Sequence, residues 1–279
     1  KVRSFFMMDE NFLLKRERAL RLLALMEKHN KAWALYVFTS ARVLNELYTI
    51  DELIRLGISW VWMGIEGEDS QYNKLAGVDT HALVKNLQEN GIRVLGSSII
   101  GLEKHSPDNI DKVIEHAVSH DTDFHQFMLY TPLPGTPLTE ELTAKGLMRS
   151  EEDIPLSRRH GQEALVHKHP SLSSDQAAGF LDKAFLRDFE ENGPSVVRIV
   201  RTTLDGLQRH KNHPDPRVRE RFIWEASELA TKYSALLGAA KLYYRDNPRM
   251  YGKMSALLRR LHAEFGWKSR LFSSIGGLW

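Results

Sequence analysis

The chain contains no cysteine among its 279 residues. Without thiols it forms neither a disulfide nor a thiolate zinc site, and it cannot by itself ligate an iron-sulfur cluster. It also has no apolar run of the roughly 20 residues that a membrane-spanning helix needs, and its amino terminus does not resemble a secretory signal. We therefore expect a soluble, cytoplasmic protein.

Two common nucleotide-binding motifs are missing as well. No Gly-x-Gly-x-x-Gly sequence follows the first apolar run, and no Gly-Lys-Ser or Gly-Lys-Thr phosphate loop occurs anywhere. Both motifs depend on glycines that let the backbone approach a phosphate closely. Nucleotide binding of the Rossmann or P-loop type is therefore disfavoured.

Five short runs of apolar, aromatic and β-branched residues occupy the first half of the chain. Their composition predicts strands that are buried on both faces. Helical patterns separate them, including a capping box at Thr49 to Glu52 and a Ser106-Pro107 start for a helix that ends near His120. The strands recur about every thirty residues, which is the length of a βα unit. The predicted strands cover residues 5–8, 33–38, 60–65, 93–100 and 124–130.

The second half of the chain has a different character. Residues 1–150 contain 17 Lys and Arg against 20 Asp and Glu, whereas residues 151–279 contain 21 against 16. The strand pattern also gives way to helical periodicity. We predict helices at 174–192, 195–210, 217–245 and 250–265. The predicted organisation is a βα barrel segment over residues 1–148, followed by a mostly helical region over residues 149–279.

The predicted strands end in polar or glycine-containing clusters. Because the carboxyl ends of parallel strands open on one edge of the sheet, these clusters would build a single site. The candidate site residues are Asp9, Glu10, Asn11, Ser40, Arg42, Glu66, Ser97, Ser98, Ile99, Gly101 and Tyr130.

Four segments at these strand ends carry a family resemblance. They are FFMMDENF at residues 5–12, WMGIE at 62–66, GSSIIGL at 96–102 and PLPGTPL at 132–138. In this order and spacing they resemble the radical S-adenosylmethionine (SAM) superfamily, and most of all its subgroup with an upstream cobalamin-binding domain. The match covers residues 1 to 148.

The resemblance implies an α/β fold, a partial (β/α)6 TIM-like barrel in which strands 2 to 6 are present, followed by the helical region. It also implies reductive cleavage of SAM at a [4Fe-4S] cluster, with cobalamin, for methyl transfer, C–C bond formation or rearrangement. Such a cluster is held by a Cys-x3-Cys-x2-Cys loop, which this chain lacks. We therefore interpret the chain as an N-terminally truncated fragment that is inactive alone. The implied partners are a small-molecule or lipid-like substrate and a reductant such as ferredoxin or flavodoxin.

The resemblance also implies roles for the strand-end residues. Asp9, Glu10 and Asn11 would receive the SAM amino group, since carboxylate and amide oxygens accept hydrogen bonds from an ammonium. Their simpler role is to turn the chain and cap the following helix. Glu66 would bind the ribose hydroxyls, or else be an exposed charge at a strand end.

The remaining candidates would surround the adenine and the SAM carboxylate. In the family, one segment runs alongside the adenine, and here it contains Ser97, Ser98, Ile99 and Gly101. Ser97 stands where a glycine is common in the family. Tyr130 and the proline-rich turn after it would close the floor of the pocket. Ser40 and Arg42 are candidates for the SAM carboxylate, because arginine binds carboxylates with two hydrogen bonds.

Several alternatives stay open. The chain could be a non-catalytic βα-barrel binding or structural module, or a metal-dependent barrel hydrolase, for which only Asp9 and Glu66 stand at suitable strand ends. His160, His167 and His169 do not have the spacing of a metal site. The basic stretch over residues 198–221 is interrupted by acids, so a solvated or interdomain surface is favoured over nucleic-acid binding. The basic and aromatic residues 259–272 suggest either a weak membrane-surface contact or docking on the protein itself.

Overall fold

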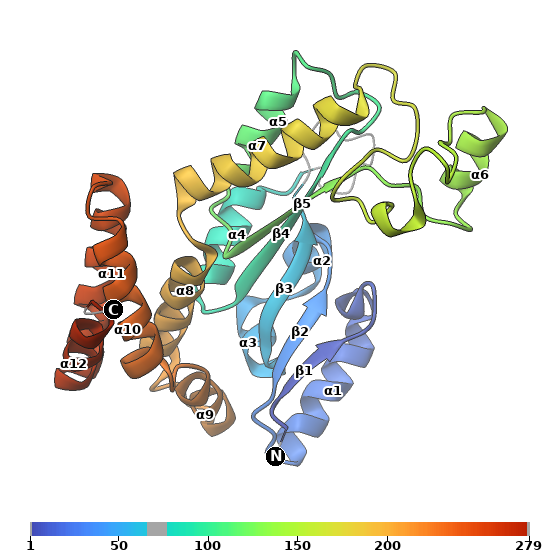
Figure 1. Ribbon diagram of the computed structural model, residues 1–279. Coiled ribbons are helices and arrows are strands. Elements are labelled where there is room, and N and C mark those ends of the chain that lie inside the picture. The colour runs from blue at the N-terminus through green and yellow to red at the C-terminus, as the bar shows by residue number, and fades with distance from the viewer. Residues whose placement is uncertain (1, 66–76, 278–279) are drawn as a thin grey trace.

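The computed structural model describes residues 2–65 and 77–277. Five parallel strands form one sheet in which each strand pairs with the next in the sequence (Figure 1). All five predicted strands are confirmed to within two residues at each end. This order, with a crossover between each pair of parallel neighbours, is consistent with a partial barrel. The strands are β1 (Ser4–Met7), β2 (Ala34–Phe38), β3 (Ile58–Gly64), β4 (Arg93–Ile100) and β5 (Phe124–Leu129).

In the described part of the chain, five helices connect the strands, and local capping chemistry sets several of their ends. The predicted capping box is present, since the Thr49 hydroxyl accepts from the Glu52 N–H while the Glu52 carboxylate accepts from the Thr49 N–H. The same helix ends at Gly57, whose φ of 85° favours glycine. The helices are α1 (Arg16–Lys28), α2 (Ala41–Leu47), α3 (Ile50–Leu56), α4 (Thr80–Glu89) and α5 (Ile110–Val118).

The predicted start of the helix before β5 is wrong. Residues 106–109 form a turn in which the Asn109 side chain accepts a hydrogen bond from the Ser106 N–H at 2.9 Å and donates one to the Lys104 carbonyl at 2.8 Å. The helix therefore begins at Ile110. An asparagine that bonds the backbone in this way competes with helix formation, so the Ser-Pro signal is overridden.

The second half of the chain is helical, as predicted, and two of its helices have the predicted bounds. The single helix expected over residues 217–245 is wrong, because the chain turns at 226–228 and forms a π-helical segment at Leu229–Tyr233. A last helix after Gly266 was not predicted. The helices are α6 (Pro137–Ala144), α7 (Ser174–Asn192), α8 (Ser195–His210), α9 (Pro216–Glu225), α10 (Ser234–Tyr243), α11 (Pro248–Phe265) and α12 (Trp267–Gly276).

The helical region shares its core with the sheet. Leu181 of α7 packs in one cluster with Ile100 and Phe127, and Phe222 of α9 packs in another with Ile58. By contrast, α10 and α11 form a separate core with α8, α12 packs on α10 and α11, and these three helices lie beyond α8 from the sheet (Figure 1). Two hydrophobic cores therefore contain residues from both sides of residue 148. The domain boundary predicted there stays a prediction.

The segment between α6 and α7 runs along the outer edge of β5. The Leu129 N–H donates to the Gly161 carbonyl at 2.8 Å, and the Gln162 side chain donates to the Phe127 carbonyl at 3.0 Å. Met148 and His167 pair in an antiparallel bridge within the same segment. These contacts hold the start of the helical region against the sheet.

Helices α10 and α12 cross at very short range, and this predicts a stability effect. A Cβ atom on Gly238 would overlap the Ser273 carbonyl, whereas one on Gly252 of α11 would meet nothing within 4 Å. We expect Gly238→Ala to lower the free energy of unfolding by about 1 to 3 kcal/mol through overpacking. The matched control Gly252→Ala should raise it by up to about 1 kcal/mol through helix propensity. Thermal unfolding of both variants measures this, and equal effects would contradict the packing argument.

Candidate functional site

The two faces of the sheet differ in what covers them. On one face, every second strand residue, such as Val37, Val61 and Phe127, packs against the helices and is fully buried. Between them, Phe6, Tyr36, Phe38, Trp60 and Trp62 form a row on the opposite face, with neighbouring ring centroids 4.7 to 5.7 Å apart. We call this row, with Ser97, Ile99 and Gln126 beside it, the aromatic face.

The aromatic face is partly open. Phe6 is 44% exposed, and the other four rings are half-buried. An ordinary barrel fills this position with branched aliphatic side chains that pack into layers. Accessible rings on the inward side of a partial barrel instead suit a ligand with an aromatic ring or a delocalised cation.

Strands β4 and β5 extend the aromatic face with polar groups. Ser97 lies in register between Gly64 and Gln126, and Ile99 lies opposite Met128. The side-chain oxygen of Gln126 is buried and accepts no hydrogen bond from residues 2–65 or 77–277. A buried acceptor without a donor costs on the order of 1 to 3 kcal/mol, so this oxygen is available to a hydrogen-bond donor. Sequence reasoning missed Gln126, although it stands at an inward position of the strand alternation.

The residues after β1 form a compact turn. Asp9 accepts from the Asn11 N–H at 3.0 Å and pairs with Arg18 at 2.8 Å. The Asn11 hydrogen bond, together with Arg18, lowers the pKa of Asp9 below its usual value. Asn11 accepts from the Thr39 hydroxyl at 3.2 Å, which ties this turn to the end of β2, while Glu10 is exposed. An ionised carboxylate therefore stands at the carboxyl edge of the sheet.

Ser40 and Arg42 both have partners within α2. The Ser40 hydroxyl caps the helix by accepting from the Val43 N–H at 3.4 Å. Arg42 is exposed and binds Glu46 one turn later at 3.0 Å. Surface pairs of this kind contribute little stability, so the Arg42 guanidinium can be released to a ligand at small cost.

Ser98 and Gly101 support the fold rather than line the aromatic face. The Ser98 hydroxyl donates to the Ile65 carbonyl at 2.6 Å and contacts His125 at 3.0 Å, on the helix-facing side of the sheet. Gly101 has a φ of 87° and donates its N–H to His105 at 3.1 Å. A side chain at Gly101 would strain the backbone, so this glycine fixes the turn that follows β4.

Three histidines gather at the carboxyl ends of β4 and β5. Burial lowers the pKa of His105 and His167 to about 4. The His167 ring meets the ring of the buried Tyr130 edge-on at 5.8 Å, and His169 bonds the Leu102 carbonyl at 2.9 Å. The neutral rings of His105, after β4, and His167, at the start of the helical region, therefore lie at this end of the sheet.

Other expectations concern metals, Glu66 and membranes. Within residues 2–65 and 77–277, no three His, Cys, Asp or Glu side chains converge to hold a metal ion. Glu66 lies outside the residues that the structure describes. None of the described helices combines the length and apolar character needed to cross a bilayer. The basic stretch of α8 and α9 is partly internal, since Arg198, Arg217 and Arg221 are buried.

Fold and site together define a parallel α/β protein with a partly exposed aromatic face on one side of its sheet. Its sequence matches no family model. It is 24% identical over 213 residues to an uncharacterized methyltransferase of Pyrococcus horikoshii, covering 71% of this chain and 45% of the relative. It is 21% identical over 155 residues to a bacteriochlorophyllide d C-8(2)-methyltransferase of Chlorobaculum tepidum, covering 53% and 34%. The chain thus spans less than half the length of these curated relatives.

Two solved structures of one enzyme are similar at a lower level. Both are of the radical SAM methyltransferase TsrM from Kitasatospora setae, one with cobalamin and a [4Fe-4S] cluster and one with tryptophan and a SAM analogue. Sequence identities are 16% and 15% and TM-scores are 0.43 and 0.48, over 81% of this chain and 52% and 53% of the other. Values this low carry no argument about function.

Proposed function

We propose that this chain supplies the SAM-binding wall of a radical SAM methyltransferase that works with cobalamin. The observation that carries the proposal is the aromatic face, where a row of tilted rings shares one side of the sheet with the buried Gln126 oxygen. The motif segments at successive strand ends and the two curated methyltransferase relatives support it. Methyl transfer is the reaction we favour over C–C bond formation or rearrangement, because both relatives are methyltransferases.

The residues present fit SAM chemically. SAM carries an ammonium, a sulfonium and an adenosine, so it needs acceptors, π-faces and hydrogen-bond partners. Asp9, Glu10 and Asn11 supply acceptors for the ammonium, and the rings of the aromatic face suit the sulfonium and the adenine. Gln126 can accept from the adenine amino group. In this proposal Glu66 binds the ribose, Ser40 and Arg42 bind the carboxylate, and Ser97, Ile99 and Tyr130 border the adenine, next to the turn that Gly101 fixes.

The residues present do not fit the iron-sulfur cluster. Cluster irons are ligated by thiolates, and this chain has none. No electron-transfer step is therefore assigned to its residues. Their part is to bind SAM, to orient it and to exclude water from it, while the cluster, the cobalamin and the reductant belong to the whole protein.

A second candidate function is a binding or structural module without catalysis. The observation that favours it is that Asp9, Ser40 and Ser98 already have partners within the fold. A module of this kind would hold its strand-end residues in internal hydrogen bonds and would not need a ligand. Measured affinity for SAM separates the two functions.

Calorimetric titration of the 279-residue chain with SAM tests the proposal. We expect saturable binding, and we expect Asp9→Asn to weaken it about 10-fold, because a charge-assisted hydrogen bond to the ammonium is lost. The matched control is Asp182→Asn, which changes an exposed carboxylate on α7 and should leave the affinity unchanged. Absence of SAM binding by the unmodified chain would reject the proposal in favour of the structural module.

A second experiment concerns the whole protein. Anaerobic reconstitution of the full-length protein with iron and sulfide should yield SAM cleavage to 5′-deoxyadenosine or methyl transfer from SAM. If the protein bound SAM but gave neither product, the proposed SAM binding would stand and the proposed reaction would be rejected.

A further inference from the structure

Helix α12 turns small residues toward the protein and large apolar residues away from it. Its buried side chains include Ser269 and Ser273, and a Cβ atom on Gly276 would overlap the Ala235 carbonyl of α10. The Ser269 hydroxyl also lies 2.7 Å from the Ser234 hydroxyl. A helix on the surface of a globular protein ordinarily has the reverse arrangement, with its large apolar residues facing the core. The close contact with α10 therefore fixes which face of α12 points outward.

Three large apolar side chains form a stripe on the outward face of α12. Trp267, Leu271 and Ile275 recur at every fourth residue, so they lie in one line along the helix. They are 75%, 48% and 41% exposed. We call these three residues the outer stripe. Because α12 packs on α10 and α11 at the end of the helical region away from the sheet (Figure 1), the outer stripe is accessible from solvent.

Basic side chains flank the outer stripe. Lys268 and Arg270 are exposed, and the helical repeat places them on the two sides of the stripe. Helix α12 contains no Asp or Glu, and Glu264, the nearest acid in the sequence, pairs with Lys211. No carboxylate within residues 2–65 and 77–277 forms an ion pair with Lys268 or Arg270. The outward face of α12 is therefore apolar in its centre and positive at its sides.

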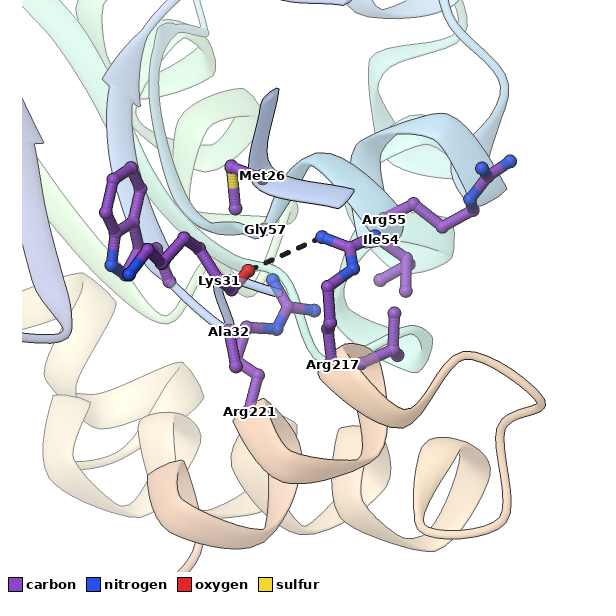
Figure 2. A pocket seen from close by; sticks show the side chains of 10 residues that line it. Met26, Lys31, Ala32, Ile54, Arg55, Gly57, Arg217 and Arg221 are labelled. Carbon is purple, nitrogen blue, oxygen red and sulfur yellow. Dashed lines mark hydrogen bonds between the residues drawn. The ribbon is translucent and has the colours of Figure 1, made fainter. Parts of the chain in front are cut away.

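The arginines at the amino edge of the sheet show a different arrangement. Figure 2 shows them where α9 meets the turns before β2 and β3. Each has a carboxylate at ion-pair distance within the fold, so their charges are balanced there. The pairs are Arg55 with Glu27 and Asp51, Arg217 with Asp215 and Glu27, and Arg221 with Glu225. By contrast, the charges beside the outer stripe are available to an anionic partner.

The structure divides the basic and aromatic residues that the sequence brings together before and within α12. Arg260 pairs with Asp205, and Phe272 is half-buried, so these two side chains dock on the protein itself. Trp267 and Lys268 are exposed. Docking on the protein therefore accounts for only part of this segment.

We propose that α12 binds the surface of an anionic lipid bilayer. A helix that lies in the bilayer interface places Trp, Leu and Ile among the acyl chains, while flanking Lys and Arg reach the headgroup phosphates. Tryptophan suits this boundary because its ring is apolar and its indole N–H is polar. A stripe this short gives weak, reversible association. The inference does not depend on the proposed function, because α12 contributes no residue to the candidate site.

A bilayer fits this face better than a second copy of the chain. Two copies joined through their outer stripes would bring Lys268 and Arg270 of one close to those of the other, and like charges across an interface are costly. Lysine is also depleted in the cores of protein interfaces, whereas interfacial helices are rich in Lys and Arg.

Co-sedimentation of the 279-residue chain with lipid vesicles tests the proposal. We expect the chain to bind vesicles of phosphatidylcholine and phosphatidylserine, and to bind pure phosphatidylcholine at least about 10-fold more weakly. Binding to the anionic vesicles should fall when sodium chloride is raised from about 50 mM to about 500 mM, because salt screens the attraction. Absence of association with the anionic vesicles, or equal association with both kinds, would overturn the proposal.

A charge variant tests the electrostatic part of the interaction. Lys268→Gln combined with Arg270→Gln should lower the partition coefficient for the anionic vesicles by about 30-fold. The matched control, Arg21→Gln with Lys85→Gln, removes the same charge from exposed positions of α1 and α4 and should leave the partition coefficient nearly unchanged. Equal losses in the two double variants would contradict a role for α12.

An apolar variant tests the outer stripe. Trp267→Ser with Leu271→Ser should weaken vesicle binding at least about 10-fold, and the control Leu25→Ser with Leu156→Ser should retain it. All four side chains are exposed, so these substitutions should leave the fold intact. If sedimentation equilibrium instead showed a dimer that Trp267→Ser dissociates, and vesicles were not bound, the stripe would belong to an interface between copies and the proposal would be wrong.

Discussion

We expect Glu225→Gln to lower the free energy of unfolding by about 3 to 5 kcal/mol. Glu225 is buried on α9 and reaches Arg93 and Ser59 on the neighbouring strands β4 and β3. Burial raises its pKa, but Arg93 and Arg221 outweigh burial and the pKa lies below its usual value. The substitution leaves two guanidinium groups buried without a carboxylate, which is far costlier than losing a surface pair.

Denaturant unfolding measures this loss against a control on the same helix. Glu220 is about half exposed and pairs with the equally exposed Arg3 at 3.2 Å. Glu220→Gln should therefore change the free energy of unfolding by less than about 1 kcal/mol. If the two variants lost the same amount, the Glu225 pair would not be the contact that fastens α9 to the sheet.

The second large effect is a loss of stability in mild acid. Desolvation by burial lowers the pKa values of six histidines below 6.5, and in five of them the shift is large. A protonated imidazole is disfavoured in these places, so the folded state binds fewer protons than the unfolded state between these values and 6.5. The five groups with large shifts are His105, His120, His167 and His210, with pKa values of about 4, and His125, with a pKa of about 3.

The sign of the pH dependence follows from this difference. Stability is fully present above the unfolded pKa of 6.5 and falls as the pH drops through 6.5 toward 4, because the unfolded state takes up the protons. Each histidine contributes on the order of 1 to 3 kcal/mol to this loss. Denaturant midpoints measured at about pH 7.5 and about pH 4.5 should therefore differ strongly.

A pair of variants assigns the acid effect to burial. His125 lies between Ser98 and Thr122 and stacks on Phe127 at 4.2 Å. His125→Gln should reduce the difference between the two midpoints, because one titrating group is gone. His160 is about half exposed, so His160→Gln should leave the difference unchanged. An unchanged pH dependence in both variants would show that other groups cause the acid loss.

Most of the sheet could be predicted from sequence because its signals are local. Each strand is a short apolar run, and Thr49, Glu52 and Gly57 define a helix by capping chemistry that involves only neighbouring residues. The break at residues 226–228 could not be predicted in this way. It follows from α9 packing Phe222 and Glu225 on the sheet while α10 packs on α12, and these are contacts between distant parts of the chain.

The sequence predicts where the candidate site lies in the fold, but not which side chains and contacts make it up. The strand-end position of Asp9 and Asn11 could be read from the sequence, yet their partners Arg18 and Thr39 come from other elements. No sequence motif marks Gln126. What distinguishes it is a buried side-chain oxygen without a hydrogen-bond donor among the described residues, which only the folded structure reveals. Ser97 and Ser98 are adjacent and chemically alike, and only the pleat of β4 assigns them to opposite faces.

The two borders of the sheet are not equivalent. Gly161 and Gln162 occupy backbone groups along β5, so that border offers fewer free groups for pairing. Within the described residues, β1 pairs with β2 alone. A strand from another segment or another molecule would therefore add beside β1, next to the turn that carries Asp9. A strand added at this border would lie next to Phe6, the most exposed ring of the aromatic face.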